Sequence, residues 1–291
     1  MLVEYRLIAK RLNPDATIGQ NFTPLTRTQR AAFIQDVLFV SNPEWFTRAE
    51  RAYFSLILRS ARRADKVLTS SRTEAARMAA AGVGSSNTPF AVGLGLSPAL
   101  LEAVPVRPPF VNPQLGEFLL TVGRLNVRKN LGNVIEGVRP AISPERPLIV
   151  VGARDGAEGE RSQAIDHLID ERSVIFSGTV SDPELSWLYR NCRLFLCLSL
   201  DEGYGLPPVE ARTLGSRVLV SERPVFRETL GAAATYVDPL DVPAIRDTVA
   251  GILLECRRPT TAFVPPAWSD VAIAFRSALT SDLTEPRDDA P

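Results

Sequence analysis

The sequence predicts an α/β protein built from two doubly wound, parallel-sheet domains, and three observations support this prediction. Short β-branched or aromatic runs alternate with longer helical patterns from residue 117 onward. A sparser version of the same alternation fills the first hundred residues. Between these regions, the stretch Pro98–Pro113 contains five prolines, which is typical of a stiff linker rather than of a packed element.

The second part of the chain carries the clearer alternation. Strands and helices that follow one another at this spacing form right-handed βαβ units and a parallel sheet covered on both faces. The expected strands are Phe118–Val122, Leu148–Val151, Val174–Phe176, Leu194–Leu198, Val218–Val220 and Thr235–Val237. The expected helices are Asn130–Val138, Glu160–Ile169, Pro183–Asn191, Pro207–Leu214 and Val225–Leu230.

The first part has fewer elements of the same kind. Strands are expected at Phe33–Val40, Val67–Ser70 and Phe90–Leu94, with helices at Pro43–Ala64 and Arg72–Ala81. With the boundary in the proline-rich stretch, the domains cover residues 1–104 and 105–279. Residues 280–291 are polar, acidic and contain proline, so this tail is expected to be disordered.

Composition excludes several classes of protein. The 291 residues include 33 basic and 33 acidic side chains. No run approaches the roughly 18 apolar residues of a membrane span, and the first residues lack the layout of a signal peptide. We therefore expect a cytoplasmic protein.

Cys192, Cys197 and Cys256 lack the spacing of paired metal ligands, so they are expected to be buried thiols. A pI near 6.7 without a stacking-aromatic motif argues against a nucleic-acid partner.

Charge is unevenly distributed along the chain. Residues 1–100 carry 13 Lys and Arg against 7 Asp and Glu, whereas the remainder carries 20 against 26. The basic residues from Arg48 to Lys66 are interleaved with apolar ones, which predicts an amphipathic helix. Such a helix suits an anionic membrane surface or an anionic substrate. A solvated helix face over a local core is the alternative.

The first candidate site follows the strand Phe118–Val122. It comprises Gly123–Asn130, and its Lys129 is one of only three lysines beside 30 arginines. A compact ammonium next to an arginine at a strand-to-helix turn suits a diphosphate, and the helix N-terminus adds positive potential. An exposed turn that merely happens to be basic is the alternative.

The second candidate site follows the strand Leu194–Leu198. Gly203 and Gly205 allow backbone amides to approach a ligand closely. Glu210 is expected in the first helical turn, where its carboxylate can accept hydrogen bonds from a vicinal diol such as a ribose, with Glu202 on the loop before it. The spacing of the two glutamates carries no information by itself. Their position on either side of a Gly-x-Gly loop at a strand-to-helix turn favours a site.

These segments resemble the donor domain of retaining GT-B glycosyltransferases of family 4. The Gly123-Arg124 to Lys129-Asn130 segment is similar to the family's basic phosphate motif. The other segments that resemble the family are Glu202–Ala211, Gly215–Val218, Gly231–Ala233, Val237–Pro239 and Gly178–Leu185 with Leu188-Tyr189. Asn42–Phe46 and Arg62–Ser71 resemble the second half of the acceptor domain, particularly in mannosyltransferase-like members. The match runs from about residue 21 to about residue 275.

The resemblance implies a GT-B fold of two Rossmann-type domains and a nucleoside-diphosphate sugar, with GDP-mannose as a candidate, held in the C-terminal domain without cofactor or metal. It assigns Arg124 and Lys129 to the diphosphate and Glu202 to the hydroxyls of the transferred sugar, as the catalytic set. Positive groups there stabilise the charge on the leaving diphosphate. The implied donor-binding residues are Gly123, Gly203, Tyr204, Gly205, Leu206 and, on the ribose, Glu210.

Two features depart from the family pattern. The chain is expected to lack the first strand and Gly-rich loop of the acceptor domain, which makes the N-terminal domain incomplete. Gln35-Asp36 stands where many relatives have His-Asp, and His167, the only histidine, is expected at the surface.

The leading hypothesis is a retaining glycosyltransferase that moves a hexose, with mannose favoured, onto a polysaccharide or lipid-linked acceptor. It would act at the cytosolic face of the membrane, with peripheral contact through the basic first part. The alternative is a truncated, inactive nucleotide-sugar-binding protein or partner subunit. A third reading is a GT-B relative with another reaction, such as an epimerase, or a Rossmann dehydrogenase. The dehydrogenase is disfavoured because no Gly-x-Gly-x-x-Gly lies between a first strand and helix.

Overall fold

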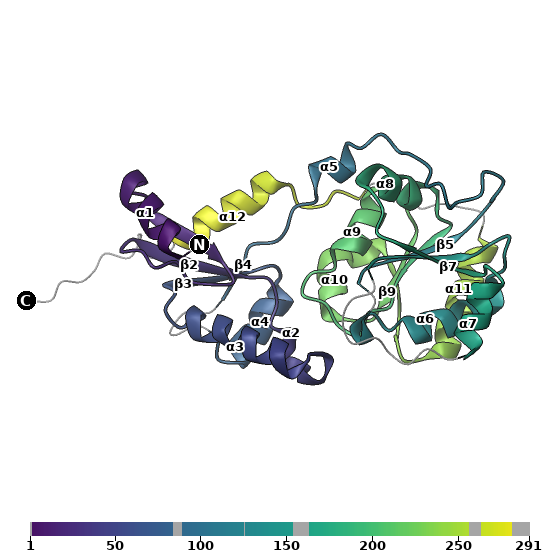
Figure 1. Ribbon diagram of the computed structural model, residues 1–291, viewed down its shortest axis with the longest axis horizontal. Coiled ribbons are helices and arrows are strands. Elements are labelled where there is room, and N and C mark those ends of the chain that lie inside the picture. The colour runs from purple at the N-terminus through teal and green to yellow at the C-terminus, as the bar shows by residue number, and fades with distance from the viewer. Residues whose placement is uncertain (1, 84–88, 125, 154–162, 256–262, 281–291) are drawn as a thin grey trace, which may run out of the picture. The chain divides into compact units, whose positions relative to one another are not determined.

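The computed structural model describes residues 2–83, 89–124, 126–153, 163–255 and 263–280 (Figure 1). These residues divide into two compact units. The described residues up to Gly95, together with those from Pro266 onward, form the first unit, and Leu96–Pro265 form the second. Within the described ranges, no helix is both long and apolar enough to cross a membrane.

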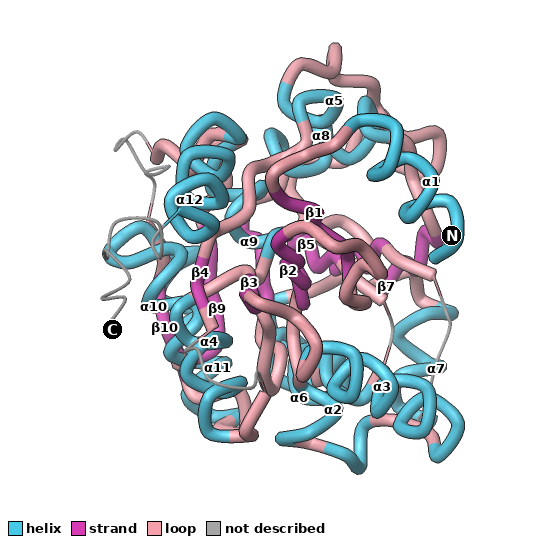
Figure 2. Tube along the Cα trace, turned by 90° about the vertical axis from the view of Figure 1, so that its left-hand side faces the viewer, coloured by secondary structure: helices cyan, strands magenta, loops and turns pink. Residues whose placement is uncertain are grey.

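The first unit is built on a four-stranded parallel sheet with the strand order β1-β2-β3-β4. Its helices α2, α3 and α4 lie on one side of the sheet, and α1 and α12 on the other (Figures 1 and 2). The strands are β1 (Ala16–Gln20), β2 (Gln29–Ile34), β3 (Lys66–Thr69) and β4 (Phe90–Ala91). The helices are α1 (Leu2–Leu12), α2 (Leu38–Ser41), the 3-10 turn η1 (Pro43–Trp45), α3 (Arg48–Ala61), α4 (Arg72–Ala80) and α12 (Trp268–Thr280).

The predicted amphipathic helix is confirmed as α3. Thr47 caps its start, because the Thr47 hydroxyl accepts a hydrogen bond from the Glu50 amide and the Glu50 carboxylate accepts one from the Thr47 amide. Ile57 and Ala61 face the core, whereas the arginines of this stretch are exposed. Lys66 was wrongly counted with that basic face. It is only 2% exposed in β3, with its ammonium 5.1 Å from the Phe90 ring centroid.

Several expectations for the first unit are wrong in their limits. The strand expected at Phe33–Val40 ends at Ile34, because the Val37 amide donates to the buried Glu74 carboxylate at 2.6 Å and the chain turns into α2. The helix expected at Pro43–Ala64 is two segments, since Phe46 and Thr47 are extended. Neither β1 nor α1 was expected. Their short or polar patterns give little periodicity.

The second unit is a six-stranded parallel sheet with the strand order β10-β9-β8-β5-β6-β7. Its strands are β5 (Leu119–Val122), β6 (Leu148–Val151), β7 (Val174–Gly178), β8 (Leu194–Cys197), β9 (Val218–Ser221) and β10 (Thr235–Val237). Its helices are α5 (Pro98–Leu101), α6 (Leu131–Val138), α7 (Gln163–Asp170), α8 (Asp182–Asn191), α9 (Leu206–Thr213), α10 (Pro224–Leu230) and α11 (Val242–Leu254), and its 3-10 turns are η2 (Val127–Lys129), η3 (Arg139–Ala141) and η4 (Gly231–Ala233). The predicted strands are confirmed to within two residues, whereas α5 and α11 were not expected.

Helices cover both faces of this sheet. Against one face pack α6, α7 and α11, whose Val134, Leu168 and Ile245 share a core cluster with the strands. Against the other lies α8, whose Tyr189 ring centre is 5.5 Å from that of Phe195 in β8. The strands β6, β8 and β9 are buried throughout, as expected for a doubly wound sheet.

Helix α12 belongs to the first unit, so the predicted division into residues 1–104 and 105–279 differs from the observed one. The Phe275 ring lies 5.7 Å from Phe33, and the Leu279 carbonyl accepts a hydrogen bond from Gln29 at 3.0 Å. Together with Ala278, these residues cover the sheet face that carries Ala31. Residues 281–291 of the predicted tail lie outside the described residues, and Thr280 ends α12.

Candidate functional site

The order of the second sheet places a reversal point between β5 and β8. From β5 the chain runs outward through β6 and β7, then returns to the other side of β5 with β8. The two connections that follow these strands diverge there, and open α/β sheets bind ligands in the resulting crevice. Both predicted site loops start at this point. They touch, because the Leu200 amide donates to the Arg128 carbonyl at 2.8 Å.

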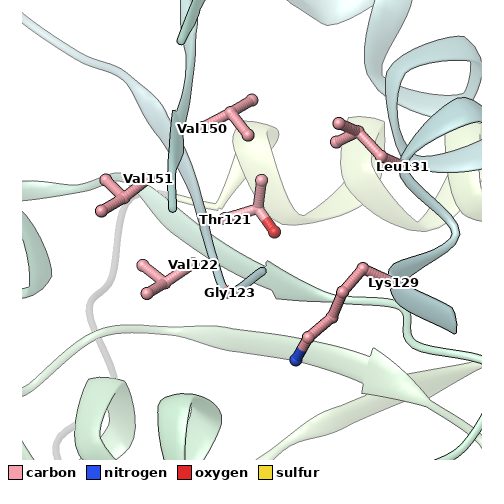
Figure 3. Close-up of a pocket in the computed structure, with 7 residues that line it drawn as sticks. All are labelled: Thr121, Val122, Gly123, Lys129, Leu131, Val150 and Val151. Carbon is pink, nitrogen blue, oxygen red and sulfur yellow. The ribbon is translucent and has the colours of Figure 1, made fainter. Parts of the chain in front are cut away.

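Gly123 makes room for Lys129. Its φ of +147° is strained for other residues, and a Cβ atom there would lie 2.7 Å from Lys129 Cε and 2.9 Å from Nζ. Figure 3 shows the lysine side chain extending alongside Gly123. The two residues line a small hollow together with Thr121, Val122, Leu131, Val150 and Val151.

Asn130 fixes the turn that carries Lys129. Its backbone is left-handed, with φ 54° and ψ 34°, a conformation that asparagine tolerates better than most residues. The side-chain amide donates to the carbonyls of Leu198, at 3.1 Å, and Pro239, at 2.7 Å. Asn130 therefore ties the start of α6 to the ends of β8 and β10, and it holds Lys129 in place.

Glu202 is the centre of the described contacts at this edge. Its Oε1 lies 2.7 Å from Lys129 Nζ, and its Oε2 pairs with the Arg128 guanidinium. Only 9% of the Glu202 side chain is exposed. Burial by itself raises the pKa of this carboxyl, but the charges of Lys129 and Arg128 outweigh burial and lower the pKa to about 2. Glu202 is therefore ionised throughout the neutral range.

The structure thus brings together two of the three predicted catalytic residues, Lys129 and Glu202. The arginine paired with Glu202 is Arg128 instead of Arg124, which lies exposed beyond the end of β5. Sequence reasoning missed this role of Arg128. The sequence does place Arg128 next to Lys129, in a turn that faces the loop of Asp201 and Glu202. It does not tell which of the two arginines, Arg124 or Arg128, points toward that loop. The assignment of Arg124 to a diphosphate stays a prediction.

Glu210 lies in α9, as expected, but in its second turn, because the helix begins at Leu206 and its first turn holds no acidic residue. Its Oε2 accepts a hydrogen bond from the Tyr189 hydroxyl of α8 at 2.9 Å. Burial raises the pKa of Glu210, the bond from Tyr189 opposes this rise, and the charge of Asp182 adds to it. Burial and the adjacent Glu210 also raise the pKa of Tyr189 well above its ordinary value. The sequence placed Tyr189 in a matching motif but gave no sign of this contact.

The glycine loop between the two glutamates is tightly packed. Gly205 has φ +84°, and a Cβ atom there would lie 2.5 Å from the Phe226 ring. Gly203 and Tyr204 are buried and Leu206 is half-buried. Pro207 and Pro208 occupy the start of α9, where a missing amide hydrogen costs little. The donor-binding roles of these loop residues stay predictions.

His167 and Cys192 lie outside the two site loops, whereas Cys197 ends β8 within reach of the charges of Lys129 and Glu202. His167 is at the surface, as predicted, 3.0 Å from Glu171. Cys192 and Cys197 are buried free thiols, as predicted, whereas Cys256 lies outside the described residues. Among the described residues, no three His, Cys, Asp or Glu side chains gather in a way that suits a metal ion.

Residues 107–259 match the family of glycosyl transferases group 1. The chain belongs to this family. The matched segment contains Gly123, Lys129, Glu202 and Glu210, so the family region coincides with the unit that carries the candidate site.

A curated relative has the same kind of activity as the family, and solved structures share the fold. The chain is 32% identical over 135 residues to the O-antigen chain mannosyltransferase RfbU of Salmonella typhimurium, an alignment that covers 46% of this chain and 38% of that protein. The matched segment thus spans well under half of this relative. The sucrose-phosphate synthase of Thermosynechococcus elongatus has a TM-score of 0.66 at 19% identity, over 96% of this chain and 72% of that one.

A second solved structure, Anabaena HepE with UDP and glucose, has a TM-score of 0.62 at 17% identity, over 99% of this chain and 81% of that one. At these identities the likeness shows the fold alone. The predicted fold class, α/β with two parallel-sheet units of the GT-B kind, is confirmed.

Proposed function

We propose that this protein is a retaining glycosyltransferase that transfers a hexose from a nucleoside-diphosphate sugar to a glycan or lipid-linked acceptor. The observation that carries the proposal is the cluster of the partly buried Lys129 and Arg128 around the buried Glu202 at the reversal point between β5 and β8. Cations at this edge suit a diphosphate, and an ionised carboxylate beside them suits the hydroxyls of a sugar.

Lys129 would stabilise the charge that develops on the leaving diphosphate. Its side chain is only 14% exposed, and a charge interaction is stronger where water is partly excluded than in bulk water. Gly123 leaves room for the lysine side chain, and Asn130 fixes the turn that carries it, so the backbone of Lys129 is in position before the donor arrives. This preorganisation is what electrostatic stabilisation of a transition state requires.

Glu202 suits hydrogen-bond acceptance better than proton removal. A carboxylate whose pKa is about 2 is a weak base at neutral pH, since efficient general bases have pKa values near the working pH. The acceptor's proton would therefore pass to the departing phosphate oxygen. The bond from the anomeric carbon to that oxygen breaks and a bond to the acceptor oxygen forms on the same face, so the configuration is retained.

Mannose is the first sugar to test, because RfbU is named a mannosyltransferase. The HepE structure holds UDP and glucose, so UDP-glucose is the informative competitor. The experiment incubates the protein with GDP-mannose or UDP-glucose and a panel of glycosides and polyprenyl-linked sugars, and reads the anomeric configuration of any product by NMR. Transfer with retention supports the proposal, and transfer with inversion contradicts it. Donor binding without hydrolysis or transfer would favour the alternative of a donor-binding subunit.

The exposed arginines of α3 suit a peripheral contact with the anionic inner face of the membrane. Arg48, Arg51 and Arg59 are exposed on α3, and Arg62 and Arg63 follow directly. Each basic residue close to such a surface contributes about 1 kcal/mol. Sedimentation with phosphatidylglycerol vesicles tests this contact. Neutral phosphatidylcholine vesicles and an Arg51→Glu, Arg59→Glu variant are the controls, and equal binding to both kinds of vesicle would exclude it.

A further inference from the structure

Arg128 joins the two site loops at three points. Its carbonyl accepts the Leu200 amide at 2.8 Å, and its guanidinium donates to the Asp201 carbonyl at 3.3 Å. The same guanidinium pairs with Glu202 Oε2. The position of Arg128 is therefore fixed through both its backbone and its side chain.

Lys129 is held less firmly than Arg128. Within the part of the chain that the structure describes, its ammonium contacts Glu202 Oε1 and no other polar group. An ammonium on a flexible stem can turn to a new anion more easily than a guanidinium held in a planar fork. The two cations thus contact separate oxygens of one carboxylate. The guanidinium of Arg128 is held by several contacts, whereas the ammonium of Lys129 can move on its flexible side chain.

We propose that Arg128 is a positioning residue that frees Lys129 for the donor. When a diphosphate draws Lys129 away from Oε1, Arg128 stays on Oε2 and keeps the Glu202 charge compensated. A carboxylate that is 91% shielded is costly to leave without a cation, so this second cation decides whether Lys129 can leave. The inference rests on the proposed function, because it assumes that a nucleoside diphosphate binds at this edge.

The proposal predicts non-additive effects on diphosphate binding. Without Arg128, Lys129 is the only cation on Glu202, and drawing it to a phosphate strands a buried negative charge. When Glu202 is changed to glutamine, no charge is stranded, so the loss of Arg128 matters little. A direct contact of Arg128 with the phosphate would instead weaken binding equally in both backgrounds.

The test is calorimetric titration of GDP and of UDP into the full chain. The variants are Arg128→Gln, Glu202→Gln and the double variant. Arg128→Gln is expected to weaken binding by about tenfold or more. In the Glu202→Gln background the same change is expected to alter affinity by no more than about twofold. Arg139→Gln, which removes a half-exposed arginine of η3, is the control for the loss of a surface charge.

Three outcomes would overturn the inference. They are wild-type affinity in Arg128→Gln, equal weakening in both backgrounds, and an Arg128→Lys variant that loses as much affinity as Arg128→Gln although it keeps the charge. Thermal unfolding checks each variant. If Arg128→Gln does not fold, Arg128→Lys is compared with wild type: a loss of affinity of no more than about twofold supports the inference, and a loss of about tenfold or more overturns it. If wild type binds neither GDP nor UDP, the proposed function fails and the inference fails with it, whereas normal wild-type binding with an unaffected Arg128→Gln overturns the inference alone.

Discussion

Glu202 lies on the connection between β8 and α9, and Glu210 lies in the second turn of α9, yet the two carboxyls have pKa values shifted in opposite directions. Glu202 meets two cations, which lower its pKa to about 2 in spite of burial. Glu210 meets a neutral tyrosine, and burial raises its pKa. The same side chain is thus held as a permanent anion in one place and as a more readily protonated acid in the other. When environments separate two carboxyls in this way, they suit different tasks.

The largest expected effect comes from removing the cation that faces the donor. Lys129→Ala is expected to weaken GDP binding by about tenfold to a hundredfold, because a hydrogen bond to a charged group contributes about 1.5–3 kcal/mol. Calorimetry measures this loss, with Lys10→Ala in the exposed part of α1 as control. Glu210→Ala is expected to weaken binding as well. Wild-type affinity in both Lys129→Ala and Glu210→Ala would remove the site from consideration.

The second prediction disturbs the surroundings of Lys129 and Glu202 without removing a charged side chain. Gly123→Ala places a Cβ atom against the Lys129 side chain and forces φ +147° on a residue that resists it. We expect a loss of about 1–3 kcal/mol in the free energy of unfolding, together with weaker GDP binding. Gly132→Ala is the matched control, since a Cβ atom there meets nothing within 4 Å. Urea unfolding that shows equal stability in the two variants would contradict the prediction.

The third prediction sets the two carboxyls against each other. Because the folded-state pKa of Glu202 is lowered, its contribution to stability is present above the ordinary value of 4.5 and is lost as pH falls towards about 2. The pKa of Glu210 is raised, so its contribution is present at low pH and is lost as pH rises through the folded-state value. The free energy of unfolding is measured with urea between pH 3 and pH 7. Glu202→Gln should reduce the loss of stability as pH falls, whereas Glu210→Gln should reduce the loss of stability as pH rises. Changes of the same sign would refute the contrast.

The smallest effect is expected at Tyr189. Tyr189→Phe removes the hydrogen bond that opposes the rise in the Glu210 pKa, so this pKa should rise further. If ionised Glu210 binds the ribose, the pH at which GDP binding is half-maximal should move upward. The loss in the free energy of unfolding should be about 1 kcal/mol. Tyr53→Phe, at an exposed tyrosine of α3, is the control, and identical pH profiles for the two variants would speak against the coupling.

The sequence predicts the second unit far better than the first for a physical reason. Its strands are runs such as Leu148–Val151, buried on both faces and therefore apolar throughout. The strand β1 alternates between buried and exposed positions in only five residues, and β2 carries the small residues Ala31 and Ala32. The packing of α12 on this sheet joins segments more than 240 residues apart, as in the Gln29–Leu279 hydrogen bond. No local pattern encodes such a contact.

The candidate site was predictable only where strand ends fix it. That Lys129 and Glu202 meet follows from their places after β5 and β8, which a parallel sheet brings to one edge. The inward turn of Arg128 depends on the winding of η2, and the bond from Tyr189 to Glu210 depends on how α8 and α9 pack. Both are side-chain choices that tertiary packing makes.

Because α12 belongs to the first unit, the chain passes between its units twice, near residues 95 and 265. A single proteolytic cut in either passage leaves the two units covalently joined. Deleting everything after residue 265 spares the unit that carries Lys129 and Glu202 but strips the first sheet of the helix that covers Ala31 and Phe33. Residues 96–265 are therefore the natural limits for expressing the unit that carries the candidate site separately, whereas the other unit needs both of its distant segments on one polypeptide.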